Sequence, residues 1–213
     1  MKTFFILFIF MFMMLLLSCR HDYHPQTGDL FFMDSDCGSF CEAIKKVTYG
    51  VDGTHPSHVG VVYINHGKTY VIEADTKGVV KTPVDSFLNR SLDEKGHPRV
   101  FVGRLKEEYL KDIPQAINRM LALLGKPYDF AFDINNDCYY CSELLYKGFL
   151  DNAGKPIFKL EPMTFNDPDT KKIFPVWEDY FKKLGIPVPE GKPGLNPGGI
   201  SRSDKIDIVY RYY

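Results

Sequence analysis

Three positions in the sequence carry side chains that together are suited to nucleophilic catalysis. Cys141 opens a segment with helical periodicity, His58 begins an apolar run, and Glu73 lies inside a second apolar run. A thiolate is stabilised at a helix N-terminus and beside an imidazolium. A carboxylate can orient that imidazolium and stabilise its charge. A Cys–His–carboxylate set of this kind supports attack of sulfur on a carbonyl carbon.

Each of these residues, taken alone, is also compatible with a structural role. A histidine before a strand is more often structural or exposed, and a cysteine at a helix start is more often inert. A glutamate in a strand usually faces solvent. The catalytic interpretation therefore depends on elements that bring the three side chains together.

The predicted strands on either side of one turn would place His58 and Glu73 close to each other. Strands are predicted over 59–64 and 69–74, joined by Asn65-His66-Gly67-Lys68, whose residue types are typical of a hairpin connection. Antiparallel pairing across this turn places Glu73 near the beginning of the His58 strand. Because a buried glutamate is costly unless it is paired, an imidazolium is a suitable partner for it.

The remaining elements indicate an α+β fold, because strands occur in one block with helices flanking it. Apolar periodicity predicts further strands over 28–33, 78–82, 100–105 and 206–212, and helices over 40–47, 113–124 and from 141 onward. The stretch 185–199 is rich in Gly and Pro and is predicted to be a surface loop.

Composition excludes some classes of partner. The 213 residues include 26 Lys and Arg and 27 Asp and Glu, and no basic stripe stands out. Nucleic-acid binding is therefore not expected. The aromatic content of 15% suits a pocket lined with rings, and equally a core rich in Phe and Tyr.

The N-terminus has the features of a bacterial lipoprotein signal. Lys2 precedes an uncharged apolar run over 4–17, which is short for a membrane span of about 20 residues and typical of a signal peptide over 1–18. The run ends in Leu16-Leu17-Ser18-Cys19, which resembles a lipobox. We expect a lipid on Cys19, a tether over 19–26 and one domain over 27–213, anchored in the cell envelope on the periplasmic or extracellular face. Ordinary secretory cleavage is the alternative.

The other four cysteines fit several interpretations. An exported protein meets an oxidising compartment, where disulfides persist. Cys37 and Cys41 are therefore expected to be small, partly buried thiols or a local disulfide. A zinc site of four thiolates that adds Cys138 and Cys141 is less favoured, because the two pairs lie far apart in the sequence and Cys141 fits the role of a nucleophile.

Five short motifs occur along the chain in a defined order. They are Gly28-Asp29-Leu30, Ser57-His58-Val59-Gly60, Ile72-Glu73-Ala74, Gly125-Lys126-Pro127-Tyr128 and Tyr140-Cys141-Ser142-Glu143. This set resembles the NlpC-type papain-like cysteine peptidases in the circularly permuted arrangement of the YiiX-like family. In the unpermuted arrangement the cysteine segment comes first. The resemblance implies a papain-like α+β fold with permuted topology, in which a small antiparallel β-barrel or sheet packs against helices.

The resemblance also implies roles for individual residues. Cys141 would be the nucleophile, His58 the general base, and Glu73 the group that orients the imidazole. Tyr128 would stand near the oxyanion as a hydrogen-bond donor, unless it is only a packing ring. Glu73 replaces the His or other polar residue frequent in unpermuted enzymes, and Tyr140 replaces their Asp, so specificity for peptidoglycan peptides does not transfer directly.

The implied activity is that of a thiol hydrolase that cleaves an amide or ester through an acyl-enzyme and needs no metal or organic cofactor. One substrate class is a small peptide of the cell wall. A second is lipid-like, for a hydrolase or acyltransferase with a tunnel lined by Phe130, Phe132, Tyr139 and Tyr140. A third possibility is a non-catalytic lipoprotein that binds lipid or peptide. The sequence gives no indication of oligomeric state.

The lipobox makes a direct prediction about Cys19. Cys19→Ala removes the thiol that would receive the lipid, so the protein should no longer incorporate labelled palmitate and should leave the membrane fraction. Metabolic labelling and fractionation measure both. Continued labelling of the variant would show that the lipobox interpretation is wrong.

Overall fold

The computed structural model describes residues 23–36 and 38–213 of the chain. The expected signal peptide over 1–18, the lipid on Cys19 and the pairing of Cys37 lie outside the described residues. Within the described part, no helix combines the length and apolar character that crossing a membrane requires.

Six antiparallel strands form the central sheet in the order β4-β3-β2-β1-β5-β8. Their bounds are β1 Leu30–Met33, β2 His58–Asn65, β3 Lys68–Asp75, β4 Gly78–Pro83, β5 Val100–Leu105 and β8 Ile206–Arg211. These bounds confirm the predicted strands to within two residues. Of the expected barrel or sheet, the structure has the sheet: the two end strands of this order, β4 and β8, are not paired with each other, so the sheet stays open.

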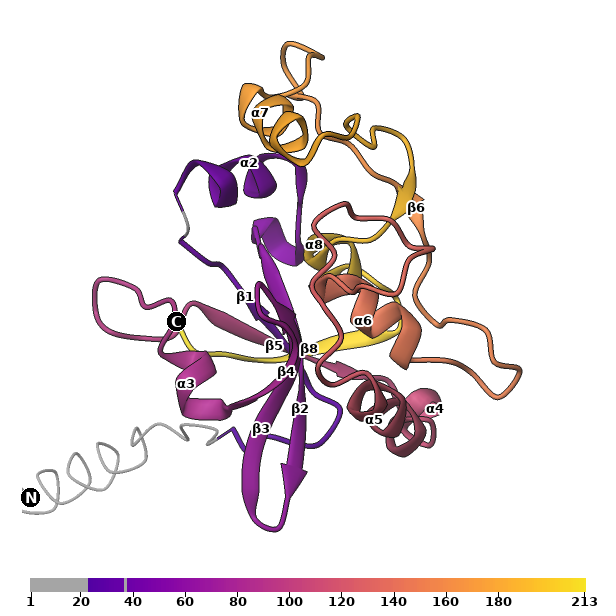
Figure 1. Cartoon of the computed structure of the whole chain (residues 1–213). Coiled ribbons are helices and arrows are strands. Elements are labelled where there is room, and N and C mark those ends of the chain that lie inside the picture. The colour runs from indigo at the N-terminus through magenta and orange to yellow at the C-terminus, as the bar shows by residue number, and fades with distance from the viewer. Residues whose placement is uncertain (1–22, 37) are drawn as a thin grey trace, which may run out of the picture.

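Helices cover both faces of this sheet. They are α2 Ser39–Val47, the 3₁₀ turn η1 Val51–Gly53, α3 Val84–Leu88, α4 Glu107–Leu110, α5 Ile113–Ala122, α6 Cys141–Gly148, α7 Pro175–Leu184 and α8 Pro197–Ser201. Two short strands, β6 Glu161–Pro162 and β7 Pro193–Gly194, pair apart from the main sheet. In Figure 1, α5 and α6 lie on one side of the sheet and α3 on the other, while α2 and α7 lie next to each other.

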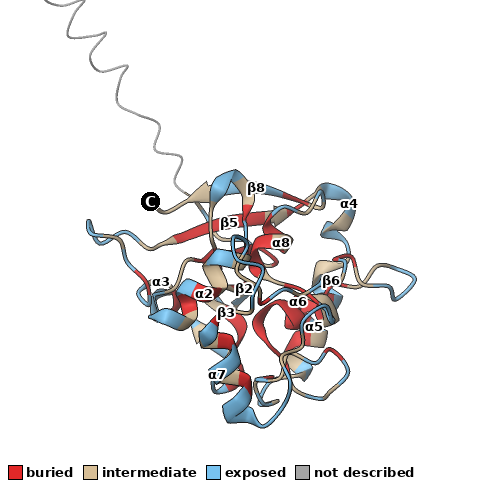
Figure 2. Ribbon diagram, turned by 90° about the horizontal axis from the view of Figure 1, so that it is seen from above, coloured by how far each residue is buried: buried red, intermediate tan, exposed pale blue. Residues whose placement is uncertain are grey.

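Alternation along β1 explains why both faces are covered. Leu30 and Phe32 pack into the core beneath α5 and α6, whereas Phe31 and Met33 pack into a second core beside α3. All four side chains are buried, because successive residues of a strand point to opposite faces and each face is apolar here. Figure 2 shows the resulting band of buried residues through the middle of the molecule.

The predicted surface loop over 185–199 is wrong in its second half. Leu195 is buried, and the chain then enters α8 with Pro197 and Gly198 also buried. A Cβ atom on Gly198 would lie 2.5 Å from the carbonyl oxygen of Tyr49. Glycine is therefore present here because two backbone segments approach closely, and not because the chain turns through solvent.

Candidate active site

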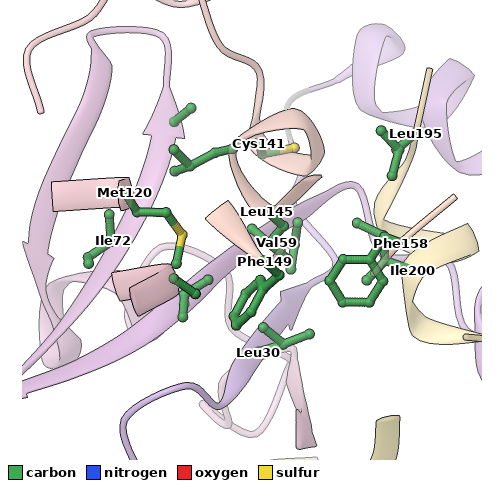
Figure 3. Close-up of a cluster of buried hydrophobic side chains, with 14 of the residues drawn as sticks. Leu30, Val59, Ile72, Met120, Cys141, Leu145, Phe149, Phe158, Leu195 and Ile200 are labelled. Carbon is green, nitrogen blue, oxygen red and sulfur yellow. The ribbon is translucent and has the colours of Figure 1, made fainter. Parts of the chain in front are cut away.

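Cys141 is the first residue of α6, and its side chain is 7% exposed. Leu144 and Leu145, on the inner side of the same helix, are fully buried and fix the helix against the sheet. Figure 3 shows Cys141 at the start of α6, with Leu145 and Phe149 further along in the hydrophobic cluster. No side chain caps the N-terminus of α6 with a hydrogen bond. The partial positive charge of the helix end therefore acts on the sulfur, where it favours a thiolate.

The hairpin of β2 and β3 brings His58 and Glu73 into direct contact. The Nε2–H of His58 donates to Oε2 of Glu73 at 2.6 Å. The two side chains are 14% and 0% exposed, so the pair is shielded from water. Gly60 makes room for this arrangement, since a Cβ atom there would lie 3.2 Å from the Cβ of Glu73 and 2.4 Å from Val71.

The Cys141 sulfur lies close enough to the His58 ring for each group to shift the pKa of the other. Burial alone would lower the pKa of His58, but hydrogen bonds with Cys141 and Glu73 outweigh it and raise the pKa to about 10. Burial alone would raise the pKa of Cys141, but the hydrogen bond and charge of His58 outweigh it and lower the pKa. Since Nε2 of His58 is bonded to Glu73, Nδ1 is the ring nitrogen available to sulfur. The geometry therefore supports a thiolate–imidazolium pair.

Glu73 also contacts two residues that the sequence analysis did not single out. Oγ1 of Thr82 donates to its Oε1 at 2.5 Å, and Arg90 donates to both oxygens, from Nη1 to Oε2 at 2.8 Å and from Nη2 to Oε1. With His58, these bonds occupy about four acceptor sites, which is the capacity of a carboxylate. Burial would raise the pKa of Glu73, but the bonds from His58 and Arg90 lower it to about 2.

Only one of these two residues had a signal in the sequence. Thr82 could have been found from the register, because it lies on β4, which pairs with β3. Arg90 follows α3 in a loop, where no local pattern indicates its partner.

The series of contacts from Glu73 through His58 to Cys141 passes around the end of the sheet. Val71, two residues before Glu73 on the same strand, packs on the α3 side, and the His58 ring lies 5.9 Å from the Phe87 ring of α3. Cys141 belongs to the core on the opposite side. His58 can link the two because it is the first residue of β2 and its ring lies at the strand end.

A cavity of about 230 Å³ opens beside Cys141. Its walls are mostly apolar and aromatic, and among the residues that line it are Ile44, Val47, Tyr128, Phe132, Tyr140, Met163, Phe165, Trp177 and Leu195. Of the four aromatic residues expected to line a tunnel, Phe132 and Tyr140 do so. Phe130 is instead 42% exposed, and Tyr139 packs into the core under α6. The segment around β6 and helix α7 supplies the other walls, which the sequence analysis missed because they lie in a loop-rich region.

Tyr128 lines the same cavity as Cys141. Burial, and then the negative charge of Cys141, raise the pKa of its phenol, so the hydroxyl keeps its proton near neutral pH. The backbone on either side of Tyr128 is tied to the segment before α6, since Tyr139 N–H donates to Pro127 O at 3.0 Å and Asp129 N–H donates to Tyr139 O at 3.2 Å. Tyr128 is thus held beside Cys141 with a donor available.

Tyr140, in place of the Asp of unpermuted enzymes, has a structural contact. Its hydroxyl accepts the Leu195 N–H at 3.1 Å and so ties the 194–199 segment to the start of α6. Two residues into the helix, Glu143 is fully buried, and its Oε1 lies 3.8 Å from Nζ of Lys147. Burial raises the pKa of Glu143 to about 8. Burial therefore reduces the negative charge that this carboxyl would place in the first turn of α6, where such a charge would oppose a thiolate.

The described cysteines have different states. Cys41 is disulfide-bonded, whereas Cys138 and Cys141 are free thiols. The disulfide removes Cys41 from the four-thiolate zinc alternative. In residues 23–36 and 38–213, no group of three or more His, Cys, Asp or Glu side chains is arranged to hold a metal ion.

Antiparallel strands that carry a histidine, packed against a helix that begins with a cysteine, define a cysteine hydrolase of papain-like architecture. A family model described as permuted papain-like amidase enzyme, YaeF/YiiX, C92 family, matches residues 24–210, and the chain belongs to this family. This membership confirms the permuted papain-like fold and the assignment as a thiol hydrolase.

Two relatives come from Escherichia coli. The chain is 31% identical over 169 residues to the uncharacterized protein YiiX of strain K12, which covers 79% of this chain and 78% of that protein. It is also similar to the crystal structure of the metalloprotein YiiX from strain O157:H7, with a TM-score of 0.70 and 26% identity over 89% of this chain and 98% of the other.

The two free thiols provide a test within one molecule. Cys138 lies three residues before Cys141, but burial and the carboxylates of Asp129 and Asp137 raise its pKa. At mildly acidic pH, where an ordinary thiol with a pKa of about 8.5 is protonated, iodoacetamide should therefore label Cys141 much faster than Cys138. Peptide mass spectrometry over a pH series measures both rates. Faster labelling of Cys138 would contradict the proposed thiolate.

Proposed function

We propose that this protein hydrolyses an amide or ester bond through an acyl-enzyme on Cys141, with His58 as general acid and base and Glu73 as the residue that orients His58. One observation carries the proposal: the buried contact of Glu73 with His58, and of His58 with Cys141, lies beside a cavity able to admit an acyl group. The closer relation to NlpC-type enzymes is part of the same proposal.

The chemistry follows from the positions of the groups. The Cys141 thiolate attacks the carbonyl carbon, and the oxyanion accepts hydrogen bonds from the Cys141 backbone N–H and the Tyr128 hydroxyl. Nδ1 of the His58 imidazolium gives its proton to the leaving amine or alcohol as that bond breaks, which leaves a thioester. Neutral His58 then takes a proton from water as the water attacks the thioester. The acid departs and the thiolate–imidazolium pair is restored.

Cell-wall peptides are the first proposed substrate. An amidase that is lipid-anchored through Cys19 on the periplasmic or extracellular face would meet such peptides there. The polar groups that line the cavity, among them Ser57, Asn196 and Arg202, offer partners for a peptide backbone or a charged end group.

A lipid-like acyl donor is the second proposed substrate, for a hydrolase or acyltransferase. The observation in its favour is the apolar wall next to the nucleophile, formed by α2, the segment around β6, and α7. An acyl chain would bury apolar surface there and gain roughly 0.8 kcal/mol for each methylene.

The proposal predicts that a natural acyl group can be trapped on Cys141. The purified domain is mixed with extract of the cell envelope, quenched with acid and digested, and the Cys141 peptide is examined by mass spectrometry. We expect an added acyl mass that hydroxylamine removes, and the mass distinguishes a peptidyl from a fatty acyl group. Cys141→Ala is the control, and acylation of Cys138 at the same level would contradict the assignment.

Glu73→Gln tests the role of the carboxylate. Gln keeps the shape and one oxygen but removes the charge that holds the imidazolium, so thiolate formation at Cys141 should shift to higher pH. Turnover should fall, though less than in Cys141→Ala. The pH profile of alkylation and the rate of acyl release measure these effects.

Asp29→Asn is a matched control for this variant, because Asp29 is also a buried carboxylate bonded to an arginine, Arg104. It should lower the melting temperature and leave the alkylation profile unchanged. If Glu73→Gln behaves in the same way, Glu73 has a structural role and is not part of the catalytic set.

A further inference from the structure

Arg90 contacts Glu73 with both terminal nitrogens of its guanidinium. Nη1 donates to Oε2 at 2.8 Å, which is the oxygen that also accepts from His58, and Nη2 donates to Oε1. A two-pronged contact of this kind fixes the plane of a carboxylate as well as its charge. The position of the oxygen that faces His58 is therefore set by Arg90 as much as by the strand.

Arg90 is itself held in place. Its guanidinium lies over the Phe87 ring at 5.2 Å, and Phe87 is fully buried. Its backbone N–H donates to the Phe87 carbonyl at 3.2 Å, and the next residue, Ser91, is buried and donates to Asp34 O at 2.7 Å. An arginine anchored on both sides in this way loses little additional freedom when it binds Glu73.

From this arrangement we propose that Arg90 is a positioning residue, which fixes the plane of the Glu73 carboxylate and shares its charge with His58, so that His58 receives a limited part of that charge. The inference rests on the proposed function of Cys141, His58 and Glu73. A purely stabilising role would leave the pKa of His58 unchanged, whereas the proposed role changes that pKa through the Glu73 carboxylate.

The electrostatic consequence has a definite sign. Arg90 offsets part of the negative charge that stabilises the His58 imidazolium, so its removal should raise the pKa of His58, by on the order of one unit. Loss of Glu73 should have the opposite effect. The other ionisable groups around these residues are Asp75, which faces Arg90, Cys141, and Tyr128, which is close to Cys141. These groups are the same in all the variants compared below, so they do not account for differences in the His58 pKa between those variants.

The measurement is an NMR titration of the His58 ring in a Cys141→Ala background. Without the thiolate, the pKa of His58 should fall to a range where the protein can be titrated, and no substrate is needed. Added to this background, Arg90→Gln should raise the pKa of His58 and Glu73→Gln should lower it. Arg90→Lys should stay near the parent, since the charge is retained.

Arg104→Gln is the matched control for this titration. Arg104 makes the same two-pronged contact, from Nε and Nη2 to the buried Asp29, at 2.7 and 2.9 Å. That pair adjoins Leu30, at the opposite end of β1 from Met33, which pairs with His58. The control should lower the melting temperature and leave the His58 titration unchanged.

An Arg90→Gln variant whose His58 titrates as in the parent would overturn the proposal. If Arg90→Gln does not fold, Arg90→Lys provides the test. A change in the His58 pKa as large as that in Glu73→Gln, although the positive charge is retained, would contradict the proposal. A second comparison adds Arg90→Gln to the Glu73→Gln background, where the His58 pKa should move much less than in the parent. An equal shift would mean that Arg90 acts directly on the ring and would overturn the positioning role. Failure to trap an acyl group on Cys141 would instead concern the proposed function and leave this titration interpretable.

Discussion

A buried carboxylate with every acceptor site in use is the constraint on which the site depends. Glu73 is fully buried in the central sheet, where an unpaired charge would cost several kcal/mol. Its cost is offset by donors from three directions: His58 from β2, Thr82 from β4, and Arg90 from the loop after α3. None of these donors can move without leaving part of the charge unpaired. The same contacts that keep Glu73 in the sheet therefore fix the imidazole at the strand end, and through it the environment of Cys141.

This coupling also links the site to stability. The pKa of Glu73 is lowered from 4.5 to about 2, so its pairing stabilises the fold above pH 4.5 and the stabilisation is lost as the pH falls toward 2. The pKa of His58 is raised from 6.5 to about 10, so its contribution is complete below pH 6.5 and is lost as the pH rises toward 10. Both contributions to stability are complete only between pH 4.5 and pH 6.5, the ordinary pKa values of Glu and His. At neutral pH the contribution of His58 is still largely present, because a pKa of about 10 keeps most of the imidazole protonated there.

Local patterns predicted most of the fold and the pairing at the centre of the site. Alternation and a four-residue turn were sufficient to place Glu73 beside His58, because register in a hairpin follows from the turn. The apolar spacing after Cys141 was sufficient to place it at a helix start. Arg90, Met163 and Trp177 were not predicted as parts of the site, since they come from two loop segments and helix α7, whose partners in the site are distant in sequence. The stretch from Leu195 to Gly198 was misjudged because glycine marks close backbone packing as well as turns.

The contacts from Glu73 through His58 to Cys141 pass around the end of the sheet. This arrangement explains how a permuted chain order can keep the proposed chemistry of a papain-like thiol hydrolase. Val71, on the same strand face as Glu73, packs on the α3 side and Cys141 on the α6 side, and His58 interacts with both Glu73 and Cys141. The helix that carries Cys141 is held by Leu144 and Leu145 in the core and by Tyr140 to the 194–199 segment, and these contacts do not require that it precede the strands. What the proposed chemistry needs is a helix N-terminus facing the first residue of β2. Any chain order that packs α6 against that strand end meets this need, whereas a shift of one residue in the register of β2 and β3 would turn Glu73 to the other face and separate it from both His58 and Arg90.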